Sequence, residues 1–293
     1  MQKVRFKPNK RWDFQYGFHY SETSDYGRYD RHLRTRNGGP RYGEWSYGPQ
    51  KWMMNNLNIT NNGSNKVYDE MALRLAIQNF EESRISRNFN DATRETRVEK
   101  VYAYSGNLDF TKSIGERHTL FYGLEVVFDD VRSNGTDTNI ETGTSTEGPA
   151  RYPYADWSSY AAYVSDHFKI NDKVVLQGGL RYNHFILNAD FDTRFYPFPF
   201  ETAKLDNGAL TGNLGAVYRP SRDWVISANA ATAFRAPNVD DMGKVFDSEA
   251  GSVVVPNPDL EAEYAYNGDV GVAKIFNKTV KVDVSAYYTL LKN

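Results

Sequence analysis

The stretch that decides the fold of this chain opens with Phe234-Arg235-Ala236-Pro237 and closes with Asn257-Pro258-Asp259-Leu260. Proline has no backbone N–H, so it cannot donate to the hydrogen-bond ladder of a sheet. The sequence therefore predicts that one strand ends near Arg235 and that another begins after Leu260. The residues between the two prolines then form a long loop that joins two strands.

Strands on either side of this loop are predicted by an alternation of apolar and polar residues. Leu176, Leu180 and Tyr182 share one face of an extended chain, whereas Gln177 and Arg181 lie on the other. A period of two residues is typical of a β-strand with one apolar and one polar face. The ranges that alternate in this way are 14–20, 71–78, 102–110, 120–128, 174–183, 210–218, 224–230, 263–272 and 280–286.

The links between these strands alternate in length, which separates two all-β architectures. Both a soluble sandwich and a membrane barrel alternate apolar and polar faces. Short periplasmic turns and long extracellular loops in turn are typical of a transmembrane barrel. The short links are expected at 61–66, 112–117, 170–173, 219–223 and 275–279, and the long ones at 23–49, 83–97, 130–156, 186–206 and 236–258. The sequence therefore predicts an antiparallel transmembrane β-barrel segment of about 11 strands.

The composition agrees with this prediction and excludes other classes of protein. The 293 residues carry a formal net charge of -2, which gives no reason to expect a nucleic-acid partner. Cysteine is absent, which excludes disulfides, cysteine metal sites and thiol nucleophiles. Aromatic residues make up 15% of the chain, as expected for the aromatic girdles of a barrel in lipid. No apolar run reaches the length of about 18 residues that a membrane-spanning helix needs.

The two boxes together resemble those that flank an extracellular loop in TonB-dependent outer-membrane receptors. Gly179-Leu180-Arg181-Tyr182 is similar to a common strand ending of that family. Glu261-Ala262-Glu263 is similar to the Lys-Pro-Glu that follows the second box, although Ala262 stands at the proline position. The resemblance implies a barrel of about 22 strands in the bacterial outer membrane, in contact with its lipid. It also implies an N-terminal plug and uptake driven by the TonB energy-coupling complex.

Residues 1–293 are accordingly expected to be part of a single receptor-type barrel domain, with about half of its strands. The first residues, Met1 to Pro8, lack the apolar core of a signal peptide, and no plug-like segment is recognised. We therefore expect a barrel fragment from which the plug domain and the signal peptide are absent. A complete small barrel of about 12 strands is the alternative architecture.

The resemblance implies a ligand of the iron-chelate class, a ferric siderophore or a similar bulky iron complex. Haem-receptor members carry a histidine between the two boxes, and residues 238–256 contain none. Cobalamin or a glycan stays open as a ligand. Nothing in the sequence predicts a cofactor or a metal site, and the acidic residues Asp240, Asp241 and Asp247 fit a solvated loop better than a calcium site.

Ligand contacts are expected where arginine and aromatic residues gather in the long loop 23–49, since both types bind anionic and aromatic groups. The candidates are Arg31, Arg34, Tyr42 and Trp45, together with Arg181 and Arg235 on the polar faces of their strands. The plainer interpretation is a solvated loop, with Arg235 and Arg181 held in ion pairs along the wall.

Readings other than a receptor keep some support. No nucleophile elbow, phosphate-binding loop or zinc-protease motif occurs, so an enzyme is not expected. A soluble all-β module that binds carbohydrate or another ligand would also alternate in its strands. A passive porin or adhesin-type barrel would share the link lengths.

Overall fold

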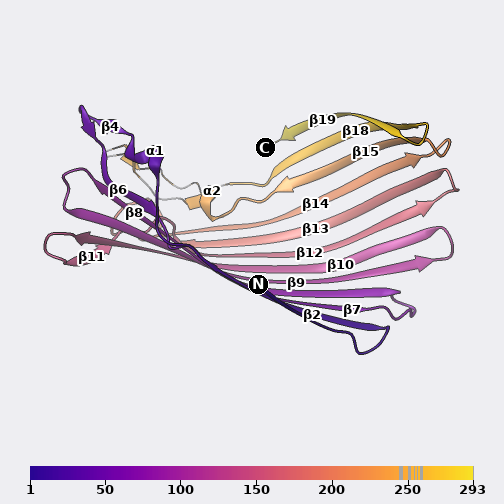
Figure 1. The fold of residues 1–293 in the computed structure, drawn as a ribbon, viewed down its shortest axis with the longest axis horizontal. Helices are drawn as coiled ribbons and strands as arrows, with labels where there is room; N and C mark the ends of the chain where they lie inside the picture. The colour runs from indigo at the N-terminus through magenta and orange to yellow at the C-terminus, as the bar shows by residue number, and fades with distance from the viewer. Residues whose placement is uncertain (244–246, 250–251, 254, 256, 258–259, 293) are drawn as a thin grey trace.

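Twelve strands lie side by side in one curved antiparallel sheet, as Figure 1 shows. This computed structural model describes residues 1–243, 247–249, 252–253, 255, 257 and 260–292. In sheet order the strands are β1 Gln2–Phe6, β2 Trp12–Glu22, β7 Lys51–Asn61, β8 Glu70–Asn88, β9 Thr93–Ile114, β10 His118–Asn139, β12 Tyr154–Lys169, β13 Val174–Asp190, β14 Thr202–Tyr218, β15 Trp224–Arg235, β18 Glu263–Phe276 and β19 Val280–Lys292. Each strand pairs with its neighbours in sequence order, as an up-and-down barrel wall requires.

Smaller elements are inserted in the links at one end of this wall, which we call the loop end; the opposite end is the turn end (Figure 1). Three short strands join the main sheet: β3 Tyr26–Gly27, β6 Tyr42–Tyr47 and β11 Ser145–Gly148. The others are α1 Tyr29–His32, β4 Thr35–Arg36, β5 Gly39–Pro40, α2 Val239–Gly243, β16 Asp247–Glu249 and β17 Ser252–Val253. The long links therefore carry structure of their own.

The strand boundaries predicted from the two prolines are confirmed. β15 ends at Arg235, two residues before Pro237, and β18 begins at Glu263, shortly after Leu260. The predicted count of about 11 strands is one short, because β1 was not recognised. β1 has only five residues, too few to establish a period, and its pairing with β2 identifies it as a strand.

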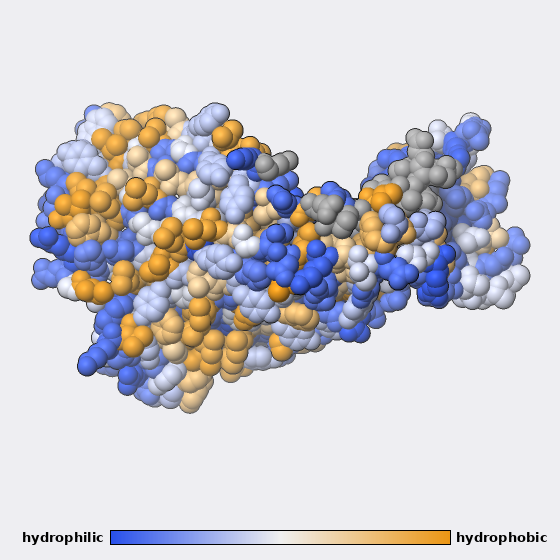
Figure 2. All heavy atoms as spheres, turned by 180° about the vertical axis from the view of Figure 1, so that it is seen from behind, coloured by the Kyte–Doolittle hydropathy of each residue, from blue (hydrophilic) through white to orange (hydrophobic). Residues whose placement is uncertain are grey.

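The two faces of the wall differ as the alternation predicts. Leu124 and Leu180 are 57% and 58% exposed on the outer face. Glu125 and Arg181 lie on the inner face, where Nη2 of Arg181 is 2.5 Å from Oε1 of Glu125. In the space-filling view, apolar residues spread in broad patches over the strands, while the loop end is mostly hydrophilic (Figure 2). An apolar outer face and a polar inner face are what a wall between lipid and lumen needs.

None of the helices in the described residues has the length and apolar character to cross a membrane.

Two of the predicted long links, 83–97 and 130–156, are wrong as loops. β8 and β9 continue through most of the first range and are joined only by residues 89–92. β10 continues to Asn139, and β11 pairs with it. Beyond the apolar band both faces of a strand meet water or polar neighbours, so the alternation stops although the ladder continues. The period of the sequence therefore detects the lipid-facing part of a strand and misses the rest.

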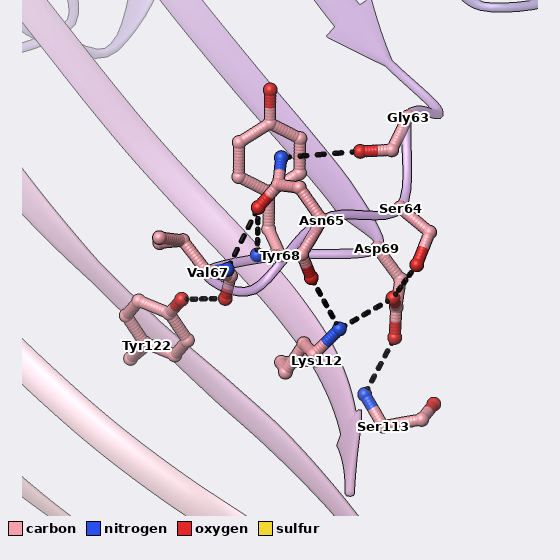
Figure 3. A network of polar contacts seen from close by, with 9 residues as sticks. All are labelled: Gly63, Ser64, Asn65, Val67, Tyr68, Asp69, Lys112, Ser113 and Tyr122. Carbon is pink, nitrogen blue, oxygen red and sulfur yellow. Dashed lines mark hydrogen bonds and ion pairs between the residues drawn. The ribbon is translucent and has the colours of Figure 1, made fainter.

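The turn between β7 and β8, residues 62–69, is braced by one carboxylate (Figure 3). Asp69 accepts hydrogen bonds from the Ser64 hydroxyl at 2.6 Å, the Lys112 ammonium at 2.9 Å and the Ser113 backbone amide at 2.8 Å. These bonds hold the pKa of Asp69 well below its usual range, with the Ser64 hydroxyl as the largest cause and Lys112 next. The turn is thereby tied to β9, the strand next to β8.

The assignment of outer and inner faces can be checked with two arginine substitutions on β13. Leu180→Arg puts a charge on the apolar outer face and should lower the free energy of unfolding of the full-length protein by about 2–4 kcal/mol in lipid vesicles. Gln177→Arg, on the inner face of the same strand, should cost less than about 1 kcal/mol. The measurement is urea unfolding followed by tryptophan fluorescence. Equal losses for the two variants would contradict the assignment.

Candidate functional site

A pocket of about 620 Å³ opens at the loop end, between the inserted elements and the wall. Its volume lies in the range of pockets that hold small ligands. We call it the basic pocket, because Arg31, Arg84, Arg97 and Arg151 line it against two carboxylates, those of Glu95 and Asp137. Three aromatic residues of β6 also line it: Tyr42, Trp45 and Tyr47.

The wall positions the aromatic side of this pocket through β6. This strand pairs with the upper part of β8, and Tyr47 lies opposite Arg84 in the register. The ring of Trp45 meets that of Tyr47 edge to face, with centroids 4.9 Å apart. The Arg31 guanidinium, from α1, lies 5.5 Å from the Trp45 ring centroid. Stacked guanidinium and aromatic groups form a surface that favours planar, anionic partners.

One carboxylate fastens the inserted segment to the wall. Glu44 of β6 accepts from Nε of Arg87 on β8 at 2.9 Å and from Nε of Arg94 on β9 at 2.7 Å. The Arg94 hydrogen bond, with help from Arg87, holds the pKa of Glu44 below its ordinary value of 4.5. The bridge holds β6 in its place beside both strands.

Two arginines of the basic pocket have hydrogen-bonding capacity to spare. Nε of Arg31 and Nε of Arg151 are buried and have no acceptor among the residues that the structure describes. Arg97, in contrast, donates to Asp137 at 2.8 Å, and Arg84 donates to Glu82 at 2.9 Å. A buried donor without an acceptor is costly unless a bound group accepts from it. The pocket therefore favours a ligand that carries several anionic oxygens.

The structure brings together three of the six ligand contacts expected from the sequence: Arg31, Tyr42 and Trp45 all line the basic pocket. Arg34 lies between α1 and β4 and does not line it. Arg181 is paired with Glu125 on the inner face of β13, far from the loop end of that strand. It is therefore placed as part of the wall.

Three arginines of the basic pocket, Arg84, Arg97 and Arg151, were missed. All three fall in ranges that the sequence predicted as loops, 83–97 and 130–156. Arg97 is a strand residue of β9, and the register places it opposite Arg84 of β8. A search for arginines in the long links would have included them, but no signal in the sequence indicates that they lie close to one another.

The first box is built into the end of β15. Arg235 forms an ion pair with Asp241 at 2.6 Å and approaches Glu263 at 3.5 Å. The ring of Phe234 lies 6.2 Å from that of Phe185, nearly parallel to it. Pro237 is buried and Ala236 is half-buried behind it. These contacts fix the exit of the loop from the wall.

Only half of the second box can be placed. Asn257 is exposed, and Leu260 packs against the apolar cluster around Leu187 and Met242 on the inner face. Pro258 and Asp259 lie outside the described residues. In the described part of the chain no group of three or more His, Cys, Asp or Glu side chains is placed to hold a metal ion.

Comparison with known proteins identifies the architecture. The family model described as "TonB dependent receptor-like, beta-barrel" matches residues 3–293. The copper transporter OprC superposes with a TM-score of 0.79 at 14% identity, over 99% of this chain and 44% of that one. The ferric yersiniabactin uptake receptor FyuA from Yersinia pestis gives 0.69 at 15% identity, over 99% and 44%.

The ferric citrate transporter FecA gives a TM-score of 0.67 at 12% identity, over 99% of this chain and 42% of that one. Likeness at such identities shows the fold alone. The chain spans less than half the length of these three proteins. No curated protein sequence matches it.

The Glu44 bridge makes a pH-dependent prediction. Because folding lowers the pKa of Glu44, its stabilising effect is present above the ordinary value of 4.5 and is lost as the pH falls below it. We expect proteolysis within 23–50 of the full-length protein to stay slow from pH 7 to pH 5 and to speed up at lower pH. Glu44→Gln should be cleaved fast already at pH 7, with no further change on acidification. A variant as resistant as the wild type at pH 7 would contradict the role of the bridge.

Proposed function

Because the chain belongs to the TonB-dependent receptor-like β-barrel family, whose members are barrels of the bacterial outer membrane, we propose that it forms the ligand-binding wall of an uptake receptor. Residues 1–293 would be part of a single barrel domain. The ligand is a bulky, anionic iron chelate of the ferric-siderophore type, held at the basic pocket. Energy for uptake would come from the TonB complex acting through a plug domain.

The observation that carries this proposal is that the buried Nε donors of Arg31 and Arg151 have no hydrogen-bond acceptor among the described residues, although Arg31 also lies 3.7 Å from Asp30. Ferric chelates present several oxygen atoms around the metal and often bear net negative charge. Hydrogen bonds from arginine to such oxygens are charge-assisted and stronger than neutral ones. The Trp45 ring beside Arg31 adds a flat apolar surface for an aromatic chelating group.

The solved structures similar to this chain are consistent with more than one cargo. Their names include a ferric yersiniabactin uptake receptor, a ferric citrate transporter and a copper transporter. A bulky anionic chelate is favoured over a bare metal ion because the pocket of about 620 Å³ presents arginine and aromatic side chains to its ligand. Such groups contact the outside of a chelate, and they do not depend on which metal lies within it.

The order of events follows from the position of the basic pocket. It lies at the loop end, where ligand from outside arrives first. Below it the inner face is polar: Arg181 pairs with Glu125, and Asn183 exchanges hydrogen bonds with Ser159. A released chelate would pass along this polar face once the plug is displaced.

Substitution of the spare donors tests the proposal. In the full-length receptor, purified in detergent, Arg31→Ala and Arg151→Ala should each weaken binding of a ferric tris-catecholate about tenfold, since each removes charge-assisted hydrogen bonds. Arg36→Ala, in the same loop but away from the pocket, should bind as the wild type does. Quenching of tryptophan fluorescence measures the dissociation constant. Unchanged affinity in both pocket variants would overturn the proposed site.

A further inference from the structure

A second pocket, of about 430 Å³, adjoins the basic pocket on the inner face of the wall. The two share Arg84, and the consecutive residues Arg151 and Tyr152 line one each. We call the second one the acidic pocket. Its described lining carries four carboxylates, those of Glu82, Glu99, Asp129 and Asp240, against the single cation Arg84.

The sheet register sets the two pockets in adjacent rows. Arg84 of β8 lies opposite Arg97 of β9, and Glu82 lies opposite Glu99. The row of arginines is thus two residues from the row of glutamates on the same face. Two residues of a strand span about 7 Å, so a positive and a negative row lie that far apart along the wall.

Glu99 is the buried group of the acidic pocket that needs a partner. Its side chain is 8% exposed, and neither carboxylate oxygen has a hydrogen-bond partner among the described residues. Ser133, opposite it on β10, accepts from the backbone amide of Arg151. The Nε atom of Arg84 lies 3.9 Å from Oε2 of Glu99, beyond hydrogen-bond distance.

Arg84 is already engaged by other groups. Its Nε donates to Glu82 at 2.9 Å, and its guanidinium lies 5.1 Å from the centroid of the Tyr47 ring. Arg84 and Glu99 form a long ion pair that includes no hydrogen bond, so the buried carboxylate keeps hydrogen-bonding capacity. A positively charged donor that enters the pocket from the lumen would supply the hydrogen bonds that Glu99 lacks.

The walls of the acidic pocket suit an ammonium group on an apolar stem. Phe80, Tyr152 and Trp157 contribute rings, and Val101 and Val131 contribute aliphatic surface. The faces of aromatic rings attract cations. Nε1 of Trp157 is also buried without an acceptor in the described part of the chain, so an oxygen near the amine would be bound as well.

We infer that the acidic pocket binds a protonated amine carried by the same ligand whose anionic chelate occupies the basic pocket. The inference rests on the proposed function and narrows it to a substrate class, an anionic iron chelate with a basic arm. Glu99 receives the ammonium group, and the two charged rows fix the distance between the two ends of the ligand.

A matched pair of probes tests this inference on the full-length receptor. One probe is a ferric tris-catecholate with a primary amine on a propyl arm, and the other is the same chelate with that amine acetylated. A third probe, 2-phenylethylammonium, contains no chelate and tests the acidic pocket alone. The variant is Glu99→Gln, which keeps the shape of the side chain and removes its charge. Glu116→Gln, in the turn between β9 and β10 at the opposite end of the wall, is the control.

The wild type should bind the amine probe about tenfold tighter than the acetylated probe, because one buried ion pair separates them. Glu99→Gln should lose this preference and still bind the acetylated probe as the wild type does, which also shows that the variant is folded. Glu116→Gln should keep the preference. 2-Phenylethylammonium should bind the wild type and not Glu99→Gln, as measured by saturation-transfer NMR.

The other outcomes separate this inference from the proposed function. Equal affinity of the two chelates for the wild type, or a preference that survives in Glu99→Gln, overturns the amine subsite and leaves the chelate site standing. Binding of 2-phenylethylammonium alone, lost in Glu99→Gln, supports the amine subsite and overturns the chelate site. Failure of all three probes to bind overturns both.

Discussion

The hydrogen-bond ladder between neighbouring strands is the constraint on which this structure depends. A lipid-facing backbone has no water to bond, so each N–H and C=O must find its partner in the next strand. The strands from β2 to β18 in the wall meet this demand by pairing on both sides, whereas β1 and β19 are the edges of the sheet in this structure and pair on one side. The face on which each side chain lies is then fixed, because successive residues of a pleated strand point alternately to the lipid and to the lumen. Leu180 and Arg181, adjacent in sequence, meet opposite environments for this reason.

The same ladder builds the walls of the two pockets beyond the apolar band. β8, β9 and β10 extend past it, with no lipid to impose an apolar face. β8 and β9 are joined by a link of only a few residues, and their register brings Arg84 opposite Arg97 and Glu82 opposite Glu99. Rigid strands position charged groups more accurately than loops can. The pockets therefore combine a fixed wall with inserted elements such as β6, which Glu44 ties in place.

The two adjacent pockets carry opposite charge, so the charge of the inner face changes sign along the wall. The basic pocket lies among the inserted elements, and the acidic pocket adjoins it on the inner face, beneath the start of α2. A ligand with one anionic and one cationic end can satisfy both only in one orientation. Specificity of this kind arises from the groups that a wrong ligand would leave unpaired, here the donors of Arg31 and Arg151 and the carboxylate of Glu99.

The sequence by itself determined the class of fold, the central part of most strands and the ends of the loop framed by Pro237 and Pro258, because lipid on one face enforces a period of two and proline stops a ladder. It also identified Arg31, Tyr42 and Trp45 as a group, since they share one loop. Only the tertiary structure decided that Arg97 and Arg151 join them and that Glu99 is buried beside Trp157. Those contacts depend on register between strands and on the folding of loops over the wall. Where both faces of a strand are polar, the sequence has no alternation of apolar and polar residues from which the register or the folding of the loops could be predicted.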